Sequence, residues 1–426
     1  MKTLFAFLSL TFAVSHSASE WPQWRGVNRD GILHGEPALA KLPAKPATLW
    51  QIPIGKGQGG LALAKGVLIV LHETSSKGKQ ETARAIRIAD GKQIWETAYA
   101  DSWQYTNVYG PGPRTAPLID GDLLFCQSAA GALACISMKN GDLLWAKNYA
   151  TDFGAKWFGG NAPGSEGTAA SRHGNNGQPV TDANYIYAPA GSHTGASLVC
   201  LEKKTGNLVW KSGTDYAAYS GLMRGTLAGV EQIVMVTAAN MIGYRAKDGK
   251  KLWSVPVKTG AARNIVTPIL HGDTVTMASH TLGTFQIRIR NSGSGQTAEE
   301  IWRNREARTN ITTPVLKDGF LYGLGASRGR NSEFVCINHK TGKTEWSERG
   351  FTDYASVISM GDTLLVHGSR GTVTLLRATP KKFTQLSRIE NASQPSWTFP
   401  VYSAGVLYVK DGLRDGKNKL TALKLR

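Results

Sequence analysis

Five arginines occur in similar local settings, and their side chains suit the recognition of acidic groups. Each lies in a short polar segment that leads into an apolar run, as in GPGPRTAP at 110–117 and AARNIVTP at 261–268. The five residues are Arg114, Arg172, Arg224, Arg263 and Arg308. A guanidinium presents a fork of N–H donors that matches the two oxygens of a carboxylate or phosphate. If the fold brings these segments together, the sequence predicts a cationic mouth that binds an acidic ligand.

Asp353, Tyr354 and Trp397 occupy comparable segments later in the chain. An aromatic ring in such a place can stack on a planar cofactor or on a sugar face. The same ring can also pack between structural units, and the arginines can bond carbonyls or neighbouring acids. The sequence leaves these alternatives open.

The sequence contains no standard catalytic or metal-binding motif. Its nine histidines form no HExxH pattern, and no GxSxG elbow is present. Only the Gly-rich stretch 158–177 offers the hard oxygen donors that calcium prefers, and a long surface loop explains that stretch equally well. Its candidate donors are Asn161, Glu166, Asn175 and Asn176. We therefore predict no metal site and assign no catalytic residue.

A repeated spacing of Cys, Gly and Trp identifies the elements that must position these side chains. The sequence reads CISMKNGDLLW at 135–145, CLEKKTGNLVW at 200–210 and CINHKTGKTEW at 336–346. A Gly four residues before each Trp marks a hairpin turn. A second hairpin lies upstream, as in APLIDGDLLFC at 116–126. Each unit therefore has four short strands, with the Trp on the last strand and a small residue on the crowded third.

Counting these units predicts the fold. Six units end in Trp95, Trp145, Trp210, Trp253, Trp302 and Trp346. In a seventh, Leu386 takes the place of the Trp, and an eighth combines 397–426 with the segment 47–54 that contains Trp50. Four-stranded sheets at this period pack radially into a β-propeller. We predict an all-β, eight-bladed propeller of antiparallel blades, closed by pairing of the N- and C-terminal segments, with seven blades as the fallback.

The Trp-ended units with KTGxxxW turns resemble the PQQ-binding-like propeller repeat family, where PQQ is pyrroloquinoline quinone. That superfamily includes quinoprotein alcohol dehydrogenases and BamB-type outer-membrane assembly factors. The stretch WPQWRGVNRDGI at 21–32 is similar to the opening of exported members. Resemblance to the dehydrogenases implies PQQ with calcium, an Asp base and an adjacent Cys–Cys pair, and this chain has no such pair. Resemblance to BamB implies an envelope scaffold held by an N-terminal lipid-bearing Cys, which is also lacking.

The N-terminal region predicts export. Residues 1–19 have the charged start, apolar centre and small-residue end of a signal peptide. We expect an arm at 20–46 and a single propeller at 47–426. Trp21 and Trp24 should pin the arm across the propeller, with Arg25 or Asp30 in a salt bridge. No later segment is long enough for a membrane helix, so we expect a periplasmic or secreted monomer without a lipid anchor.

The cysteines and the net charge limit the remaining possibilities. Cys135, Cys200 and Cys336 occupy equivalent places in different units, so only Cys126 could reach Cys135 in a disulfide, which stays open. The net charge is +18, but the basic residues are scattered and no nucleic-acid motif is present. This charge indicates either a soluble surface that is cationic without a specific role, or a surface that attracts anionic envelope polymers or lipids.

We therefore predict an exported propeller that binds an anionic small molecule, a glycan or an envelope protein and catalyses nothing. One alternative is a PQQ-dependent quinoprotein dehydrogenase. The other is a carbohydrate-binding or carbohydrate-processing envelope protein.

Overall fold

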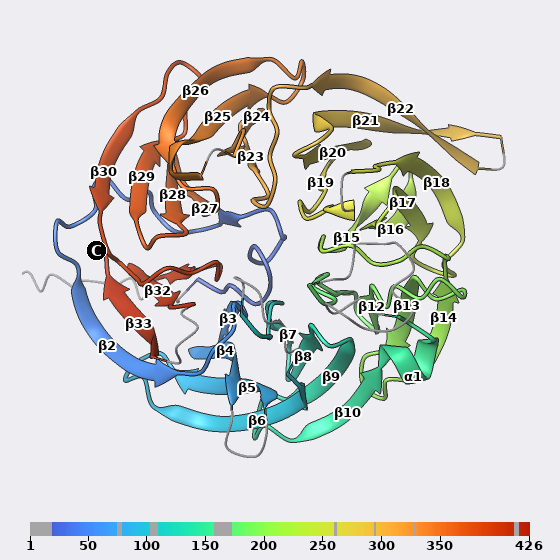
Figure 1. Cartoon of the computed structure of the whole chain (residues 1–426), viewed down its shortest axis with the longest axis horizontal. Coiled ribbons are helices and arrows are strands. Elements are labelled where there is room, and N and C mark those ends of the chain that lie inside the picture. Colours follow the sequence, from blue (N-terminus) through green and yellow to red (C-terminus); the bar gives the residue numbers. More distant parts are fainter. Residues whose placement is uncertain are drawn as a thin grey trace, which may run out of the picture.

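Eight four-stranded antiparallel sheets form a closed ring in the computed structural model (Figure 1). The structure describes residues 19–74, 79–102, 110–156, 173–259, 262–293, 295–327, 329–412 and 417–426. The helical elements named within these ranges are α1 (Tyr149–Phe153) and the 3-10 turn η3 (Gly329–Asn331). The predicted all-β class and the count of eight blades are confirmed.

The strands run outward from the central channel in sequence order within each blade. Blades 1 to 4 comprise β3 (Leu61–Ala64), β4 (Val67–Thr74), β5 (Gln80–Arg87) and β6 (Gln93–Asp101); β7 (Leu118–Asp120), β8 (Leu123–Ser128), β9 (Ala132–Ser137) and β10 (Leu143–Asn148); β11 (Val180–Thr181), β12 (Tyr185–Ala188), β13 (Leu198–Glu202) and β14 (Leu208–Ser212); and β15 (Met223–Leu227), β16 (Val230–Val236), β17 (Asn240–Arg245) and β18 (Lys251–Pro256).

Blades 5 to 8 follow the same plan, and the last blade closes the ring. They comprise β19 (Ile269–His271), β20 (Thr274–Ser279), β21 (Gly283–Ser292) and β22 (Gly295–Asn304); β23 (Val315–Lys317), β24 (Phe320–Leu324), β25 (Ser332–Asn338) and β26 (Thr344–Phe351); β27 (Ala355–Met360), β28 (Thr363–Gly368), β29 (Val373–Arg377) and β30 (Gln385–Ile389); and β31 (Val401–Ser403), β32 (Val406–Lys410), β33 (Asn418–Lys424) and β2 (Ala47–Ile54). Strand β2 pairs antiparallel with β33, and Trp50 lies opposite Ala422. The predicted joining of the two ends of the chain in one blade is confirmed.

The repeated Trp and Gly form the joint between neighbouring blades. The Trp145 indole lies against Gly206 in the turn of the next blade, and its Nε1 donates to the Lys203 carbonyl at 2.9 Å. Gly206 has φ +71°, and a Cβ there would lie 2.7 Å from the indole. The same contact joins Trp50 to Gly91, Trp95 to Gly141, Trp210 to Gly249 and Trp302 to Gly342. Gly is therefore needed both for the turn conformation and for the space that the indole takes.

This joint predicts a position-specific effect on stability. Gly206→Ala should lower the free energy of unfolding by about 3 kcal/mol, because it adds a clash with Trp145 to the cost of a positive φ. Gly229→Ala is the matched control, since Gly229 has φ +78° but nothing within 4 Å of the new Cβ. The control should cost about 1 kcal/mol. Denaturant unfolding of both variants measures the difference, and equal losses would show that the indole contact contributes nothing.

Blade 7 differs from the prediction at the Trp position. Leu375 pairs with Ser387 and Leu376 with Gln385, so Leu386 is the extra residue of a β-bulge and Ser387 takes the place of the Trp. The assignment of Leu386 to that place was wrong by one residue, because the sequence did not reveal the bulge. The Leu42 amide donates to Ser387 Oγ at 2.8 Å, and Leu42 is buried in the same cluster as Leu375. The N-terminal arm thus fills space that an indole would occupy.

The arm also enters the channel, where the blue trace reaches the centre of Figure 1. Its short strand β1 (Ile32–Leu33) pairs parallel with β27, the inner strand of blade 7. The buried Arg25 donates to the carbonyls of Arg29, Asp30, Thr313 and Pro314. The predicted salt bridge of Arg25 is therefore replaced by bonds to carbonyls, while Asp30 lies 3.4 Å from His34 Nε2.

All four cysteines are buried and free. Cys135 lies opposite Phe125 and Cys126 opposite Ala134, so neighbouring register positions direct the two thiols to opposite faces of the sheet. Cys126 packs in the core between blades 1 and 2, and Cys135 packs in the core between blades 2 and 3. The disulfide that the sequence left open is therefore not formed.

Candidate functional site

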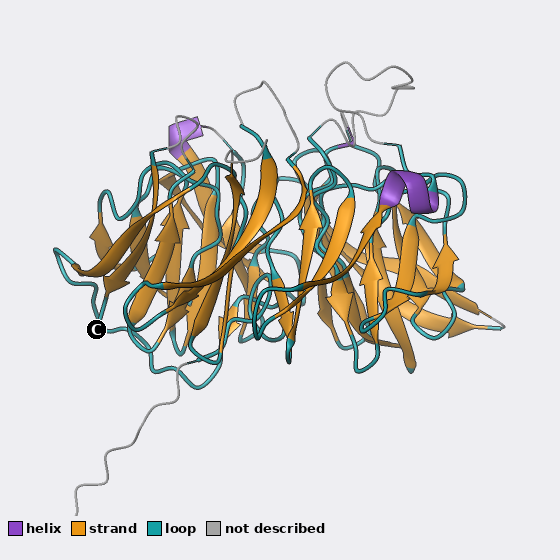
Figure 2. Ribbon diagram, turned by 90° about the horizontal axis from the view of Figure 1, so that it is seen from below, coloured by secondary structure: helices purple, strands orange, loops and turns teal. Residues whose placement is uncertain are grey.

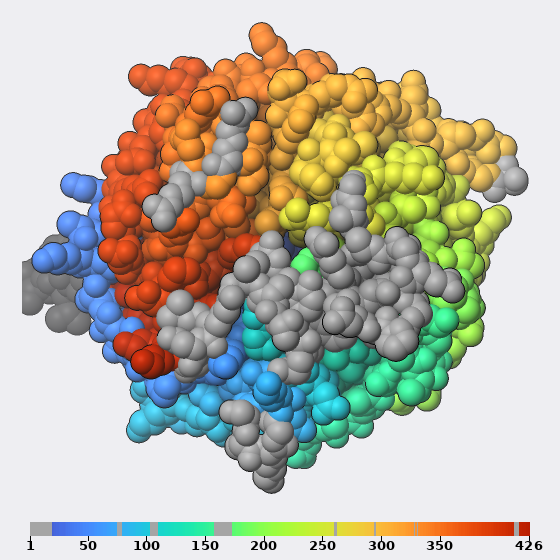
Figure 3. Space-filling model, viewed as in Figure 1, coloured from blue at the N-terminus to red at the C-terminus, as the bar shows by residue number. Residues whose placement is uncertain are grey.

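A pocket of about 170 Å³ lies in the channel above the arm. Each of the eight blades contributes to its wall from the segment that precedes its innermost strand, and Trp24 of the arm completes it. Figure 2 shows the ring from the side, with α1 at the upper face and the C-terminus at the lower one. Figure 3 looks onto the upper face, where the crossing segments run, and shows a small opening at its centre. We call this upper face the pocket face.

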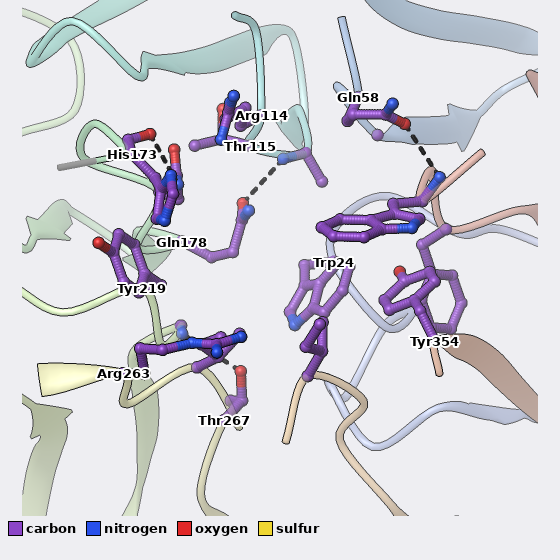
Figure 4. A pocket seen from close by; sticks show the side chains of 18 residues that line it. Trp24, Gln58, Arg114, Thr115, His173, Gln178, Tyr219, Arg263, Thr267 and Tyr354 are labelled. Atoms are coloured by element: carbon purple, nitrogen blue, oxygen red, sulfur yellow. Dashed lines mark hydrogen bonds between the residues drawn. The ribbon is translucent and has the colours of Figure 1, made fainter. Parts of the chain in front are cut away.

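Aromatic rings form one side of the pocket (Figure 4). Tyr354 and Trp397 lie with their ring centroids 5.7 Å apart and their planes at 30°. Trp24 meets Phe399 edge-on, with centroids 5.1 Å apart. These rings come from blades 7 and 8 and from the arm, so three separate parts of the chain build one apolar wall. Such a wall suits the face of a planar group.

The opposite side is polar and cationic, as the labelled Arg114, His173 and Arg263 show in Figure 4. Arg263 makes no ion pair with any residue in the described ranges. Burial lowers the pKa of His280, and the positive charge of Arg263 lowers it further. None of the described wall residues is Asp or Glu. The charge of Arg263 is therefore not neutralised within the described wall, while Arg114 donates to the Gly110 carbonyl.

Trp24 Nε1, a donor, and Asn176 Oδ1, an acceptor, are buried polar atoms of the wall that lack a hydrogen-bond partner among the described residues. An unsatisfied buried polar group costs roughly 1–3 kcal/mol, so such pairs are uncommon without a reason. A ligand that accepts one bond and donates another would satisfy both atoms.

Amide side chains hold the wall in place. Gln58 Oε1 accepts from the Trp397 amide at 2.9 Å, and Gln58 Nε2 donates to the Gly412 carbonyl at 2.9 Å. Gln178 Oε1 accepts from the Ala116 amide at 3.0 Å. Each bond joins segments from different blades. The pocket is therefore fixed by the ring rather than by any one blade.

The arm adds positive charge behind the wall. Arg29 is buried, and its Nη2 lies 3.1 Å from where a Cβ on Gly221, a wall residue, would stand. It donates to the Pro179 carbonyl at 2.6 Å and to Gln23 Oε1 at 3.1 Å. Burial lowers the pKa of Arg25 to about 10, and burial together with the Arg25 charge lowers the pKa of Arg29 to about 9. Both guanidinium groups stay charged at neutral pH.

The structure gathers only part of the predicted arginine set. Arg114, Arg263 and Trp397 line the pocket, and so does Tyr354. Arg224 lies within β15 and pairs with Glu231 across a hairpin, so its exposed side chain points away from the pocket. Arg308 is exposed and donates to the Arg305 carbonyl, and Ile311 represents its blade in the wall.

The remaining candidates also fall outside the pocket or outside the description. Asp353 accepts from Ser369 Oγ at 3.3 Å and does not line the wall. Asn175 Oδ1 accepts from Gln127 Nε2, and Asn175 Nδ2 donates to the Pro189 carbonyl. Its side chain therefore has a structural role. Arg172, Asn161 and Glu166 lie outside the described residues. Of the four described arginines of the expected ring, Arg114 and Arg263 line the pocket opposite the aromatic side, and Arg224 and Arg308 do not.

Sequence reasoning missed Trp24, His173, Tyr219 and Phe399 as wall residues. Tyr219 lies four residues before β15, as Arg114 lies four residues before β7. Counting back from the inner strand would have selected Tyr219 in place of Arg224. Trp24 gave no such signal, because only the path of the arm takes it under the channel.

Comparison with known proteins identifies the family. Residues 40–156 and 159–385 match the family described as outer membrane protein assembly factor BamB. The chain belongs to this BamB-like PQQ-repeat family. The structure is similar to that of BamB from Moraxella catarrhalis, at 13% identity and a TM-score of 0.58, covering 89% of this chain and 98% of that one. No curated protein sequence matches.

Two other solved structures resemble the chain to different degrees. The computationally designed Ika8 protein has 11% identity and a TM-score of 0.59, covering 89% of this chain and 99% of that one. A quinohemoprotein alcohol dehydrogenase from Pseudomonas putida HK5 has 10% identity and a TM-score of 0.49, covering 96% of this chain and 80% of that one. At these identities the likeness concerns fold alone.

The described pocket does not fit a calcium–quinone pair. Calcium takes six to eight oxygen ligands, usually with carboxylates among them. The described wall offers no carboxylate, and no group of three His, Cys, Asp or Glu residues in the described ranges could hold a metal ion. Its arginines and aromatic rings fit a planar anion instead. We therefore derive no oxidation step from this site.

Proposed function

We propose that this BamB-like propeller is a binding module for a planar, anionic small molecule. The observation that carries the proposal is the opposition of an aromatic side and an arginine side across one pocket. A flat group would lie against Tyr354 and Trp397, and an acidic group would receive the N–H donors of Arg114 and Arg263. Trp24 Nε1 and Asn176 Oδ1 would bond polar atoms on the edge of the ligand.

The same residues make binding more plausible than catalysis in this pocket. Arginine stays protonated over the working pH range and is a poor acid or base. The imidazole of His173 lies 5.8 Å from the Tyr219 ring, centroid to centroid, beside the cationic side. No described wall residue supplies a carboxylate base to accompany it. The pocket is thus better suited to holding an acid than to transforming one.

A binding screen on the purified protein tests this function. Tryptophan fluorescence and calorimetry would be recorded with planar aromatic mono-, di- and tricarboxylates, PQQ among them, and with acidic sugars as a non-planar comparison. We expect saturable binding of planar acids that strengthens with the number of carboxylates. Dye-linked alcohol oxidation after addition of PQQ and Ca²⁺ would instead support the quinoprotein alternative. Binding of acidic sugars alone would favour the carbohydrate alternative.

We also propose that the protein is exported and acts in the cell envelope. Two observations support this location. Residues 1–19 have the pattern of a signal peptide, and the matching family is described as an outer membrane protein assembly factor. No helix in the described residues is long and apolar enough to cross a membrane. An envelope protein partner is the second candidate function, supported by the family alone. Fractionation of cells expressing the full chain would test export directly.

A further inference from the structure

A second feature lies on the face opposite the pocket. The turns between the third and outer strands lie on this face, and six blades carry exposed lysines there. One from each blade is Lys92, Lys139, Lys204, Lys250, Lys340 and Lys381, and the same turns contain the exposed Lys247, Lys343 and Lys382. We call this set the lysine crown. Within the described ranges, none of its members is in an ion pair.

Two of the acids near the crown are neutralised by arginines, whereas Asp142, Glu202 and Glu345 lie in or beside the same turns and bond uncharged side chains. Asp90 pairs with Arg87, and Asp248 pairs with Arg245. Further toward the channel, Asp120 pairs with Lys203 at 2.7 Å. The crown lysines outnumber these three acids, so the turns carry an excess of positive charge. This arrangement concentrates on one face part of the net charge of +18.

Exposed apolar side chains accompany the crown. Within the described residues, seven of the eight large apolar side chains that are exposed lie one or two positions before a blade's Trp. Six of them are near the start of an outer strand, and Ile301 is near the end of β22. Ile94, Leu144 and Val209 are each the unpaired extra residue of a β-bulge and are 44%, 48% and 43% exposed. A bulge residue is left out of the ladder, which is why these side chains are turned outward.

The symmetry of the ring decides which partner fits. Equivalent turns of a propeller lie at the same height, so the lysines and the bulge residues repeat around one plane. A folded protein partner would cover one sector of that plane, whereas a membrane surface meets the whole of it. Lysine beside exposed Leu, Ile and Val is also the chemistry of interfacial binding to anionic lipid. We propose that this face docks onto an anionic phospholipid surface, leaving the pocket face turned away from it.

Co-sedimentation of the whole protein with vesicles tests the proposal. The protein should bind vesicles that contain phosphatidylglycerol and not vesicles of phosphatidylcholine alone. The combined variant Lys139→Glu, Lys204→Glu and Lys250→Glu should weaken that binding at least roughly tenfold, since each basic residue near an anionic surface contributes about fivefold. The matched control is Lys79→Glu, Lys156→Glu and Lys258→Glu, which changes the net charge equally at exposed residues at the pocket-face ends of strands. The control should bind like the unchanged protein.

Leu144→Ser with Val209→Ser should remove the binding that survives at high salt, because screening leaves only the apolar contact. Unfolding midpoints of all variants confirm that they fold. Three results would overturn the proposal. They are failure of the unchanged protein to bind anionic vesicles, equal losses in the two triple variants, and tighter crown-dependent binding to soluble polyglutamate than to vesicles.

Discussion

Replacing Arg263 with Glu is expected to weaken binding of a planar carboxylate roughly a hundredfold, because a charge-assisted bond is lost and repulsion is added. Arg263 lies in the cationic side of the pocket without an ion-pair partner in the described ranges. The substitution therefore removes a charge that the ligand would use and breaks no described ion pair. Titration calorimetry with the best acid from the screen measures the change.

Arg224→Glu is the control for this prediction. Arg224 was in the same predicted set, but it lies outside the pocket and pairs with Glu231. Its reversal makes the same change in net charge and should leave the affinity within about twofold. If both variants lost affinity equally, the anion would be held by the overall charge and the pocket would not be its site. Binding unchanged in Arg263→Glu would exclude this wall outright.

The second large effect concerns acid stability and rests on two buried histidines. Burial lowers the pKa of His367 to about 4, and burial with the neighbouring His271 lowers the pKa of His339 to about 4. Gln286 Nε2 donates to His339 Nε2 at 2.7 Å, a bond that requires the neutral ring. Since the folded-state pKa lies below the usual 6.5, the unfolded chain takes up protons first as the pH falls. The contribution of these two histidines to the free energy of unfolding should therefore be fully present above pH 6.5 and should be lost as the pH falls from 6.5 to 4.

The loss should be roughly 2–3 kcal/mol for each histidine. His339→Gln and His367→Gln should each flatten the pH dependence of the unfolding free energy in this window, whatever their effect at neutral pH. His34→Gln is the control, because the His34 side chain is 58% exposed. Urea unfolding at several pH values gives the slopes. Slopes unchanged in both buried variants would contradict the assignment.

The predictions for Arg263 and for the crown lysines concern two faces with different roles. The pocket face would present an anion site to the surrounding solution, and the lysine crown would hold the ring against lipid. The two proposals are independent, since Arg263→Glu should spare vesicle binding and the crown variant should spare the pocket. Measuring both ligands on both variants separates them.

The sequence by itself determined the architecture, because the architecture depends on a local pattern repeated along the chain. A turn Gly four residues before a Trp specifies one hairpin. Five such units, a sixth that ends in Trp302, a seventh and a shared eighth specify a closed ring. The contact between Trp145 and Gly206 shows why the pattern can be recognised, since five of the eight blades use such a Trp–Gly pair to meet the next blade. The place of Trp50 opposite Ala422 followed from the same count.

Only the tertiary structure decided which side chains meet in the channel. Arg114 and Arg263 line the pocket while Arg224 does not, because the start of each inner strand differs by a few residues and sets the direction of the side chain. Trp24 joined the wall because the arm passes under the channel, and Ser387 took the place of a Trp because Leu42 of the arm packs beside it. A sequence repeat reflects contacts that recur from blade to blade. The pocket is made where the blades differ and where a non-repeating arm crosses them, so its composition depends on long-range packing that no local pattern records.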